Sequence, residues 1–209
     1  LNYAVNTDLI PNFRLALIYD EPFGAKVKFS GENNFIATDL PASDAYTRVE
    51  VKSRNLTTLL GYNLNKNVMI YAGPALQQLQ ADVHLRGFTY GPNSGYNNHF
   101  DDIAVGWVAG LSYAKPEMGI LASLTYRSEV EHKATIKEDV PLADIVFAGN
   151  YSHSNSGTIT TPESINLNLQ TGLNATTAVY AKVRYVPWGD FAYYPPVLKA
   201  STTAALGKG

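Results

Sequence analysis

The stretch GILASLTYRSEVEHKATIKED, residues 119–139, decides the fold class. Even positions from 120 to 126 are apolar, whereas the odd positions carry polar or charged side chains: Ser123, Thr125, Arg127, Glu129, Glu131 and Lys133. A period of two is typical of a β-strand with one apolar face and one polar face. We therefore expect a strand over residues 119–136, far longer than the five or six residues of a typical globular strand.

The composition excludes several classes of protein. The 209 residues suit one large all-β domain or two small ones, and a net charge of −2 gives no electrostatic basis for binding nucleic acid. The absence of cysteine excludes disulfides, thiolate metal sites and thiol catalysis. No apolar run reaches about 18 residues, so no transmembrane helix is expected. Charged residues make up 16% of the chain, which is typical of a β-rich envelope or secreted protein.

Alternation between turn residues predicts about eight strands. Besides 119–136, we expect strands at residues 12–18, 23–37, 46–62, 68–85, 103–114, 163–173 and 178–185. The apolar phase of 46–62 shifts between Val51 and Leu56, which favours a bulge or a change of register there. One short helix could form within residues 139–148.

The connections alternate in length. Residues 19–22, 63–67, 114–118 and 174–177 form short turns, whereas residues 38–45, 86–102 and 137–162 form longer loops. In an antiparallel up-and-down meander, this alternation brings all the long loops to one end. Outer-membrane barrels have this arrangement.

Strand length separates a membrane barrel from a soluble sheet, since both can have one apolar and one polar face. A tilted strand crosses the hydrocarbon with about 9–11 residues, and 46–62, 68–85 and 119–136 all exceed that. On strand 103–114 we expect the lipid-facing set to be Ile103, Val105, Trp107, Ala109, Leu111 and Tyr113. We expect the charged half of 119–139 to face the lumen and then to stand above the membrane.

Several segments resemble the FadL family of outer-membrane transporters of long-chain fatty acids and hydrocarbons. LTYRSEV (residues 124–130) is similar to a family signature, with WVAGLSY (107–113) before it and TPESINLNLQTG (161–172) after it. PNF (11–13), FGAKVKFS (23–30), GYNLNKN (61–67) and YVPWGDF (185–191) follow the family's order. The resemblance is collinear over nearly the whole chain.

The resemblance implies an all-β, antiparallel, up-and-down transmembrane β-barrel of fourteen strands, plugged by an N-terminal hatch. With about eight strands, residues 1–209 are expected to form a partial outer-membrane barrel domain that lacks the hatch and the C-terminal strands, as a fragment or a shortened relative. The expected location is the bacterial outer membrane. Expected partners are a long-chain fatty acid or another hydrophobic small molecule, outer-membrane lipid and lipopolysaccharide, and detergent in structures. We expect a monomer.

The function that the resemblance implies is passive transport of hydrophobic molecules, by capture between two loops and lateral release through a strand kink. From the loops 86–102 and 137–162 we select as ligand-binding candidates Phe88, Tyr90, Phe100, Leu142, Ile145, Val146 and Phe147. Loop-on-loop packing would explain the same apolar residues. For the lateral opening we select the interruption at Gly31, Glu32, Asn33 and Asn34, where an ordinary bulge is the alternative.

A fatty-acid carboxylate inside a lumen needs a cation, because an unpaired buried charge is costly. Parity alone points Arg127, Lys182 and Arg184 into the lumen. The alternative for Arg127 is an internal ladder of charges with Glu129, Glu131 and Lys133.

No enzyme motif, metal-ligand spacing or cofactor motif is present, so we expect neither an enzyme nor a cofactor or metal. Two other functions remain open: a non-transporting structural or adhesive outer-membrane barrel, and a soluble β-sandwich binding module.

Overall fold

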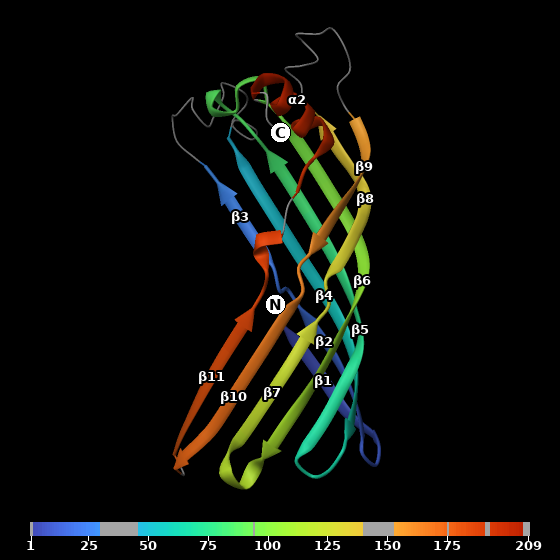
Figure 1. The fold of residues 1–209 in the computed structure, drawn as a ribbon, viewed down its shortest axis with the longest axis vertical. Helices are drawn as coiled ribbons and strands as arrows, with labels where there is room; N and C mark the ends of the chain where they lie inside the picture. Colours follow the sequence, from blue (N-terminus) through green and yellow to red (C-terminus); the bar gives the residue numbers. More distant parts are fainter. Residues whose placement is uncertain are drawn as a thin grey trace.

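The computed structural model describes residues 2–29, 46–93, 95–139, 153–174, 176–190 and 193–206, which form one large antiparallel sheet (Figure 1). Its strands are β1 (Tyr3–Ile10), β2 (Phe13–Asp20), β3 (Gly24–Lys28), β4 (Arg48–Asn63), β5 (Val68–His84), β6 (Asn97–Lys115), β7 (Ile120–Arg127), β8 (Val130–Asp139), β9 (His153–Thr161), β10 (Ser164–Asn174) and β11 (Thr177–Tyr185). The helical elements are η1 (Phe88–Asn93), η2 (Pro116–Met118), η3 (Trp188–Asp190) and α2 (Pro196–Leu206). None of the described helices is long and apolar enough to cross a membrane.

The sheet is an up-and-down meander that crosses the wall eight times, as predicted. Each crossing, called a stave from here on, consists of one strand or of two strands in line. The order of strands is β1-β2-β4-β5-β6-β7-β10-β11. β3 pairs with the far end of β4, beyond β2, and β8 and β9 pair with each other beyond β7 and β10. Three staves are therefore each interrupted once, and eleven strands make eight staves.

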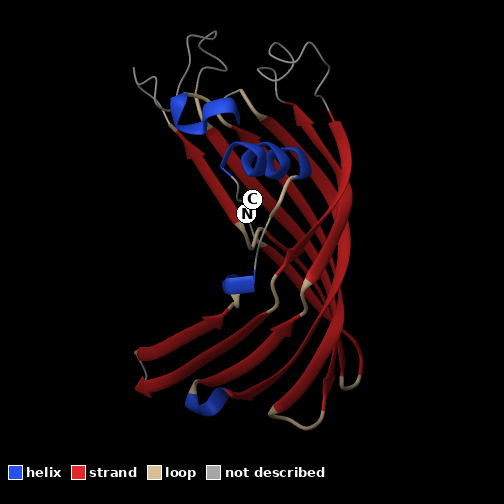
Figure 2. Cartoon of the chain, turned by 45° about the horizontal axis from the view of Figure 1, so that its top comes forward, coloured by secondary structure: helices blue, strands red, loops and turns tan. Residues whose placement is uncertain are grey.

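The wall is curved and open at both edges. Figure 2 shows the sheet bent like part of a barrel wall, with α2 on its concave side near the end that carries the long connections. Among the described strands, β1 pairs only with β2 and β11 only with β10. Both faces of β1 and of β11 are exposed along their whole length.

A continuous apolar belt covers the convex face. The set that was expected to face lipid on β6 does point outward, since Ile103 is 64% exposed, Trp107 51% and Leu111 47%. Apolar residues of the neighbouring strands lie beside them in register: Leu60, Tyr62, Ile70, Leu76, Leu124, Leu167 and Val183. From Ile103 to Tyr113 the belt is about 33 Å long along the strand, or about 25 Å in height at a tilt near 40°. That height matches the apolar band of an outer-membrane barrel.

The register change expected within residues 46–62 is wrong. The pairing of β4 with β5 keeps one register from Arg48↔His84 to Asn63↔Met69. Along β4 the apolar side chains move from the outward to the inward positions because the environment of each face changes beyond the belt. In the belt the outward residues Leu56 and Leu60 are apolar, whereas above it the outward residues are polar and the inward Val51 packs on a core.

The single strand expected over residues 119–136 is also wrong, because Ser128 and Glu129 separate β7 from β8. The break changes the parity. Even residues of β7 face outward, but the even residues Val130, His132 and Ile136 of β8 are buried on the concave side. The charged row therefore divides at the break. Arg127 faces inward, whereas the exposed outer face of the wall carries Glu129, Glu131 and Lys133.

Other boundaries also differ from the expectation. β1 and β9 lie in segments that were not expected to form strands, β6 begins six residues earlier than expected, and α2 was not foreseen. Residues 19–22 are no turn, since β2 and β3 both pair with β4 on either side of the interruption. The helix considered for residues 139–148 lies almost entirely outside the described residues.

A buried carboxylate fastens α2 to the concave face. Glu138, which is 1% exposed, accepts hydrogen bonds from the backbone N–H groups of Val197 and Leu198 at 3.1 Å and from the Tyr96 hydroxyl at 2.9 Å. The Tyr193 hydroxyl donates to Asn98, which in turn donates to Tyr96. Burial raises the pKa of the Tyr96 hydroxyl, and it raises the pKa of Tyr193 to about 12, so both hydroxyls keep their protons near neutral pH.

We expect Glu138→Ala to release α2, because the first N–H groups of a helix need acceptors. Loss of such a capping acceptor costs about 0.5–2 kcal/mol. Hydrogen exchange of residues 196–206 should accelerate by about tenfold. Lys137→Ala, on the exposed outer face of the same strand, is the control and should leave exchange unchanged. Equal protection in both variants would contradict the role given to Glu138.

Candidate functional site

The concave wall carries a mostly apolar cavity of about 330 Å³ at the level of the outer belt. Its apolar lining comes from Ala16, Ile18, Leu59, Met69, Tyr71 and Val108. Polar groups converge on the same space from Asn6, Arg14, Thr57, Thr125 and Arg127. A largely apolar hollow with a few fixed polar groups is the usual form of a small-molecule site.

Tyr71 closes the floor of this cavity in a fixed orientation. Its hydroxyl lies 2.6 Å from Thr125 Oγ1, two strands away. Gly110 lies beneath the ring, and a Cβ at that position would come within 2.5 Å of the ring carbon Cζ. A glycine on β6 therefore makes room for the tyrosine of β5.

A polar belt crosses the concave wall directly above the cavity. Gln77 accepts from Thr161 Oγ1 at 2.7 Å and lies 3.0 Å from His132 Nε2. The other ring nitrogen of His132 lies 3.2 Å from Asp102. Because every one of these groups has a partner, the polar belt stabilises the packing of neighbouring strands and offers no unoccupied binding site among these groups.

Two guanidinium groups and one carboxylate meet at the upper edge of the cavity. Arg127 Nη2 lies 3.7 Å from Asp20 Oδ2, and Arg184 is close enough to interact electrostatically with both residues. Arg127 also donates weakly to Thr57 at 3.5 Å. Asp20 Oδ1 is buried without a hydrogen-bond partner among the described residues. The cluster carries one net positive charge, so it can accept a further carboxylate.

Aromatic side chains hold Arg184 in this place. Its guanidinium carbon lies 5.1 Å from the centre of the Phe23 ring, and Phe23 packs edge-on against Trp188 at 5.3 Å. Phe23 lies between β2 and β3, whereas Trp188 belongs to η3 after β11. Phe23 therefore joins the interrupted second stave to the last stave, through Arg184 over its ring and Trp188 at its side.

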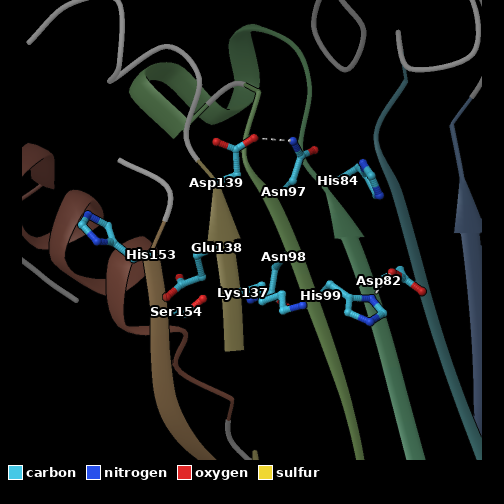
Figure 3. Close-up of a pocket in the computed structure, with 10 residues that line it drawn as sticks. All are labelled: Asp82, His84, Asn97, Asn98, His99, Lys137, Glu138, Asp139, His153 and Ser154. Carbon is cyan, nitrogen blue, oxygen red and sulfur yellow. Dashed lines mark hydrogen bonds and ion pairs between the residues drawn. The ribbon is translucent and has the colours of Figure 1, made fainter. Parts of the chain in front are cut away.

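A second cavity, of about 470 Å³, lies at the end of the sheet that carries the long connections (Figure 3). Its lining is polar: Asp82, His84, Asn97, Asn98, His99, Lys137, Glu138, Asp139, His153 and Ser154. His99 Nδ1 lies 2.7 Å from Asp82, and Asn97 donates to Asp139 at 3.2 Å. We prefer the smaller cavity as the candidate site, because this larger one has almost no apolar side chain to hold a hydrophobic molecule.

The structure brings together only part of the expected site. Arg127 and Arg184 meet at the cavity, and Lys182 shares the concave face of β11 with Arg184. Phe88 is 77% exposed in η1, and Tyr90 is half-buried there. Phe100 does not lie in a loop as expected. It belongs to β6 and is completely buried against Leu79, Ala81, Ile136 and Ile159.

The remaining candidates lie outside the described residues. These are Leu142, Ile145, Val146 and Phe147 of the second loop, and Gly31, Glu32, Asn33 and Asn34 of the expected opening.

Sequence reasoning missed the apolar lining of the cavity and Asp20. A usable signal was present, since Leu59 and Val108 are apolar residues on faces that are otherwise small or polar. Asp20 was assigned to a turn, although it continues the inward parity of Ala16 and Ile18.

The curved meander, its apolar outer belt and its partly polar inner face define an outer-membrane β-barrel wall. A family model described as outer membrane protein transport protein (OMPP1/FadL/TodX) matches residues 2–206. The chain therefore belongs to this family of transport proteins, which locates it in the bacterial outer membrane.

Solved structures show the same fold. A FadL homologue of Pseudomonas aeruginosa matches with a TM-score of 0.68 and 13% identity, over 90% of this chain and 48% of its own. The Ralstonia pickettii toluene transporter TbuX matches with 0.60 and 11%, and the Pseudomonas putida toluene transporter TodX with 0.56 and 13%. Both matches cover 90% of this chain, with 54% of TbuX and 55% of TodX. The chain thus spans about half the length of these structures. Among curated proteins, none matches the chain.

Proposed function

We propose that the chain forms part of a barrel that passes hydrophobic molecules across the outer membrane by diffusion. The observation that carries this proposal is the apolar cavity on the concave wall, behind the lipid-facing belt. Burial of an alkyl chain contributes about 0.8 kcal/mol per CH₂, so such a cavity can hold a long chain with few polar contacts. No energy source is needed for movement down a gradient.

Within this function, we assign the substrate class to long-chain fatty acids, with neutral hydrocarbons as the second candidate. The cluster of Arg127, Arg184 and Asp20 supports the choice, because its net positive charge suits a carboxylate beside an apolar cavity. Lys182 supplies a further cation on the same face. The solved relatives include a FadL homologue and two toluene transporters, which keeps hydrocarbons as the alternative.

Entry and exit complete the proposed path. Molecules are captured between the loop of residues 86–102, which carries Phe88 and Tyr90, and the loop of residues 137–162, whose apolar candidates are Leu142, Ile145, Val146 and Phe147. Phe100 supports the entry from within the wall. Release occurs sideways into the bilayer at Gly31, Glu32, Asn33 and Asn34. The resemblance to the FadL family supports this path.

Ligand-specific loss of binding tests the assignment. In the full-length protein, Arg127→Gln and Arg184→Gln should each weaken binding of a fluorescent long-chain fatty acid about tenfold, since hydrogen bonds to charged groups contribute about 1.5–3 kcal/mol. Binding of a neutral monoaromatic hydrocarbon should not change. Lys133→Gln, a cation on the outer face, is the control.

The outcomes separate the candidate functions. Equal loss of both ligands would assign the two arginines to structure, and binding of the hydrocarbon alone would assign the barrel to hydrocarbons. If the protein binds neither molecule, and vesicles that contain it take up neither, the transport proposal fails and a structural or adhesive barrel remains.

A further inference from the structure

A row of buried polar side chains joins the polar belt to the candidate site. It runs from Arg127 through Asn55 and Gln77 to His132 and ends at Asp102. Asn55 and Gln77 are each 1% exposed, and His132 is completely buried. The five residues come from five different strands, β7, β4, β5, β8 and β6, so the row exists only in the folded wall. It connects Arg127 to a titratable group beyond the cavity.

Hydrogen bonding determines how the Asn55 amide is oriented. Only with its oxygen toward Arg127 can Asn55 accept from Nη1, at 2.8 Å, and donate from its nitrogen to the backbone oxygen of Arg54 at 3.1 Å. The same nitrogen then lies 3.1 Å from the Gln77 amide. This acceptor is closer to Arg127 than Asp20, which lies 3.7 Å away. Asn55 therefore helps to hold the guanidinium in place.

The protonation state of His132 decides whether Asn55 can keep this orientation. When His132 is neutral with its proton on Nδ1, that nitrogen donates to Asp102, and the bare Nε2 accepts from the Gln77 amide nitrogen. The Gln77 oxygen then faces Asn55 and accepts from its nitrogen. Every donor in the row meets an acceptor, and Asn55 holds Arg127.

A charged His132 reverses both amides. Its two ring nitrogens both donate, so Gln77 must present its oxygen to Nε2 and its nitrogen to Asn55. Asn55 can accept from that nitrogen only by turning its own oxygen away from Arg127. Two groups that can only donate then face each other at 2.8 Å, and Arg127 loses its acceptor in the wall.

The titratable group that faces His132 is Asp102 of β6, which lies 3.2 Å from Nδ1. The other neighbours are uncharged: Gln77 of β5, Ile159 of β9 and Phe100 of β6, whose ring centre lies 6.4 Å away. Histidine changes its charge between about pH 5 and 8, and burial disfavours the charged form. The reversal of the amides is therefore expected on acidification.

We propose that Asn55 and Gln77 are positioning residues that couple the protonation of His132 to the strength with which Arg127 binds a ligand carboxylate. This inference rests on the proposed function, in which Arg127 receives that carboxylate. Acidification removes an internal acceptor from Arg127 and turns an N–H group of Asn55 toward the same space, so an anionic ligand is held more tightly. Bound ligand must in turn favour the charged form of His132.

The first test measures binding of a fluorescent long-chain alkyl sulfonate, which stays anionic in acid, to the full-length protein in detergent. From about pH 8 to about pH 4.5, binding should tighten about fivefold, the net contribution of one hydrogen bond. His132→Gln and Gln77→Met should each remove this pH dependence. His99→Gln, which removes an exposed histidine of the outer face, is the control and should keep it.

A second measurement needs no ligand. In protein with isotope-labelled arginine, the side-chain N–H signal of Arg127 is identified by its loss in Arg127→Gln. This signal should shift on acidification in the unaltered protein and in His99→Gln, but not in Gln77→Met or His132→Gln. A heat-modifiable gel shift confirms that each variant is folded before either measurement.

The outcomes separate this inference from the proposed function. If Arg127→Gln binds the sulfonate as tightly as the unaltered protein at every pH, the proposed function fails. If binding depends on Arg127 but weakens on acidification, or keeps the same pH dependence in His132→Gln and Gln77→Met, the coupling fails and the proposed function stands. An Arg127 signal that shifts equally in Gln77→Met overturns the coupling whatever the ligand does.

Discussion

Leu124→Arg will lower the free energy of unfolding by about 2–4 kcal/mol, the cost of a cation near the middle of the lipid-facing surface of a barrel. Leu124 pairs with Leu111 on one side and Leu167 on the other, and all three lie on the outer face. The side chain is 42% exposed on this outer face, so a substituted arginine would extend away from the protein into the surroundings of the belt. Guanidinium unfolding of the full-length protein in lipid vesicles measures the loss.

The control for this prediction is Thr135→Arg. Thr135 is exposed on the outer face of β8, beyond the break that separates β8 from the belt strand β7. There the new arginine meets water, and we expect a change within about 0.5 kcal/mol. If Leu124→Arg and Thr135→Arg unfold at the same denaturant concentration, the outer face of β7 does not contact lipid and the membrane assignment fails.

The sequence predicted the membrane half of the wall well, because a simple rule applies there. Along Ile103 to Tyr113, lipid lies on one side and a partly polar interior on the other, so alternation of side chains reports the strand and its faces directly. Short turns such as residues 63–67 were equally clear from their turn-forming residues. The pattern of short and long connections then sufficed to predict the meander.

Beyond the belt the same rule fails, because water replaces lipid outside and an apolar core forms inside. Leu79, Phe100 and Ile136 face inward in this region. The apolar side chains therefore change from outward to inward positions at Val51 on β4, without any change of register. At Ser128 the same change follows from a break in the strand. Alternation alone cannot distinguish these two causes.

The sequence could predict the candidate site only as a set of side chains whose odd or even position in a strand points them inward. Arg127 and Arg184 were selected because they point inward, but they lie 57 positions apart in the sequence. Their meeting depends on the interruption near Phe23 and on Trp188, which hold Arg184 in place. Asp20 was missed because an interrupted stave and a tight turn have the same sequence signal of acidic residues followed by proline.

The second large effect is expected at Gly73, where two backbones approach closely in the middle of the wall. A Cβ at Gly73 would lie 2.9 Å from the carbonyl carbon of Thr58 and closer still to its oxygen. The ladder between β4 and β5 is interrupted at this level, between the pairs Thr57↔Ala75 and Leu60↔Ala72, although the register continues. Pro74, which has no N–H group to donate, occupies the same level. The glycine therefore allows β5 to follow β4 past a segment without hydrogen bonds.

Gly73→Val should cost about 3 kcal/mol, the upper end of the range for overpacking, because the obstacle is backbone and cannot rotate away. The control is Gly61→Ala on β4. There a Cβ would meet the Met69 sulfur at 3.0 Å, a flexible end that can move, and we expect a change below about 1 kcal/mol. Both values come from guanidinium unfolding in lipid vesicles. A loss for Gly73→Val no larger than that for Gly61→Ala would mean that β4 and β5 do not approach as closely as the structure has them, and that the register which aligns Leu59 with the cavity needs revision.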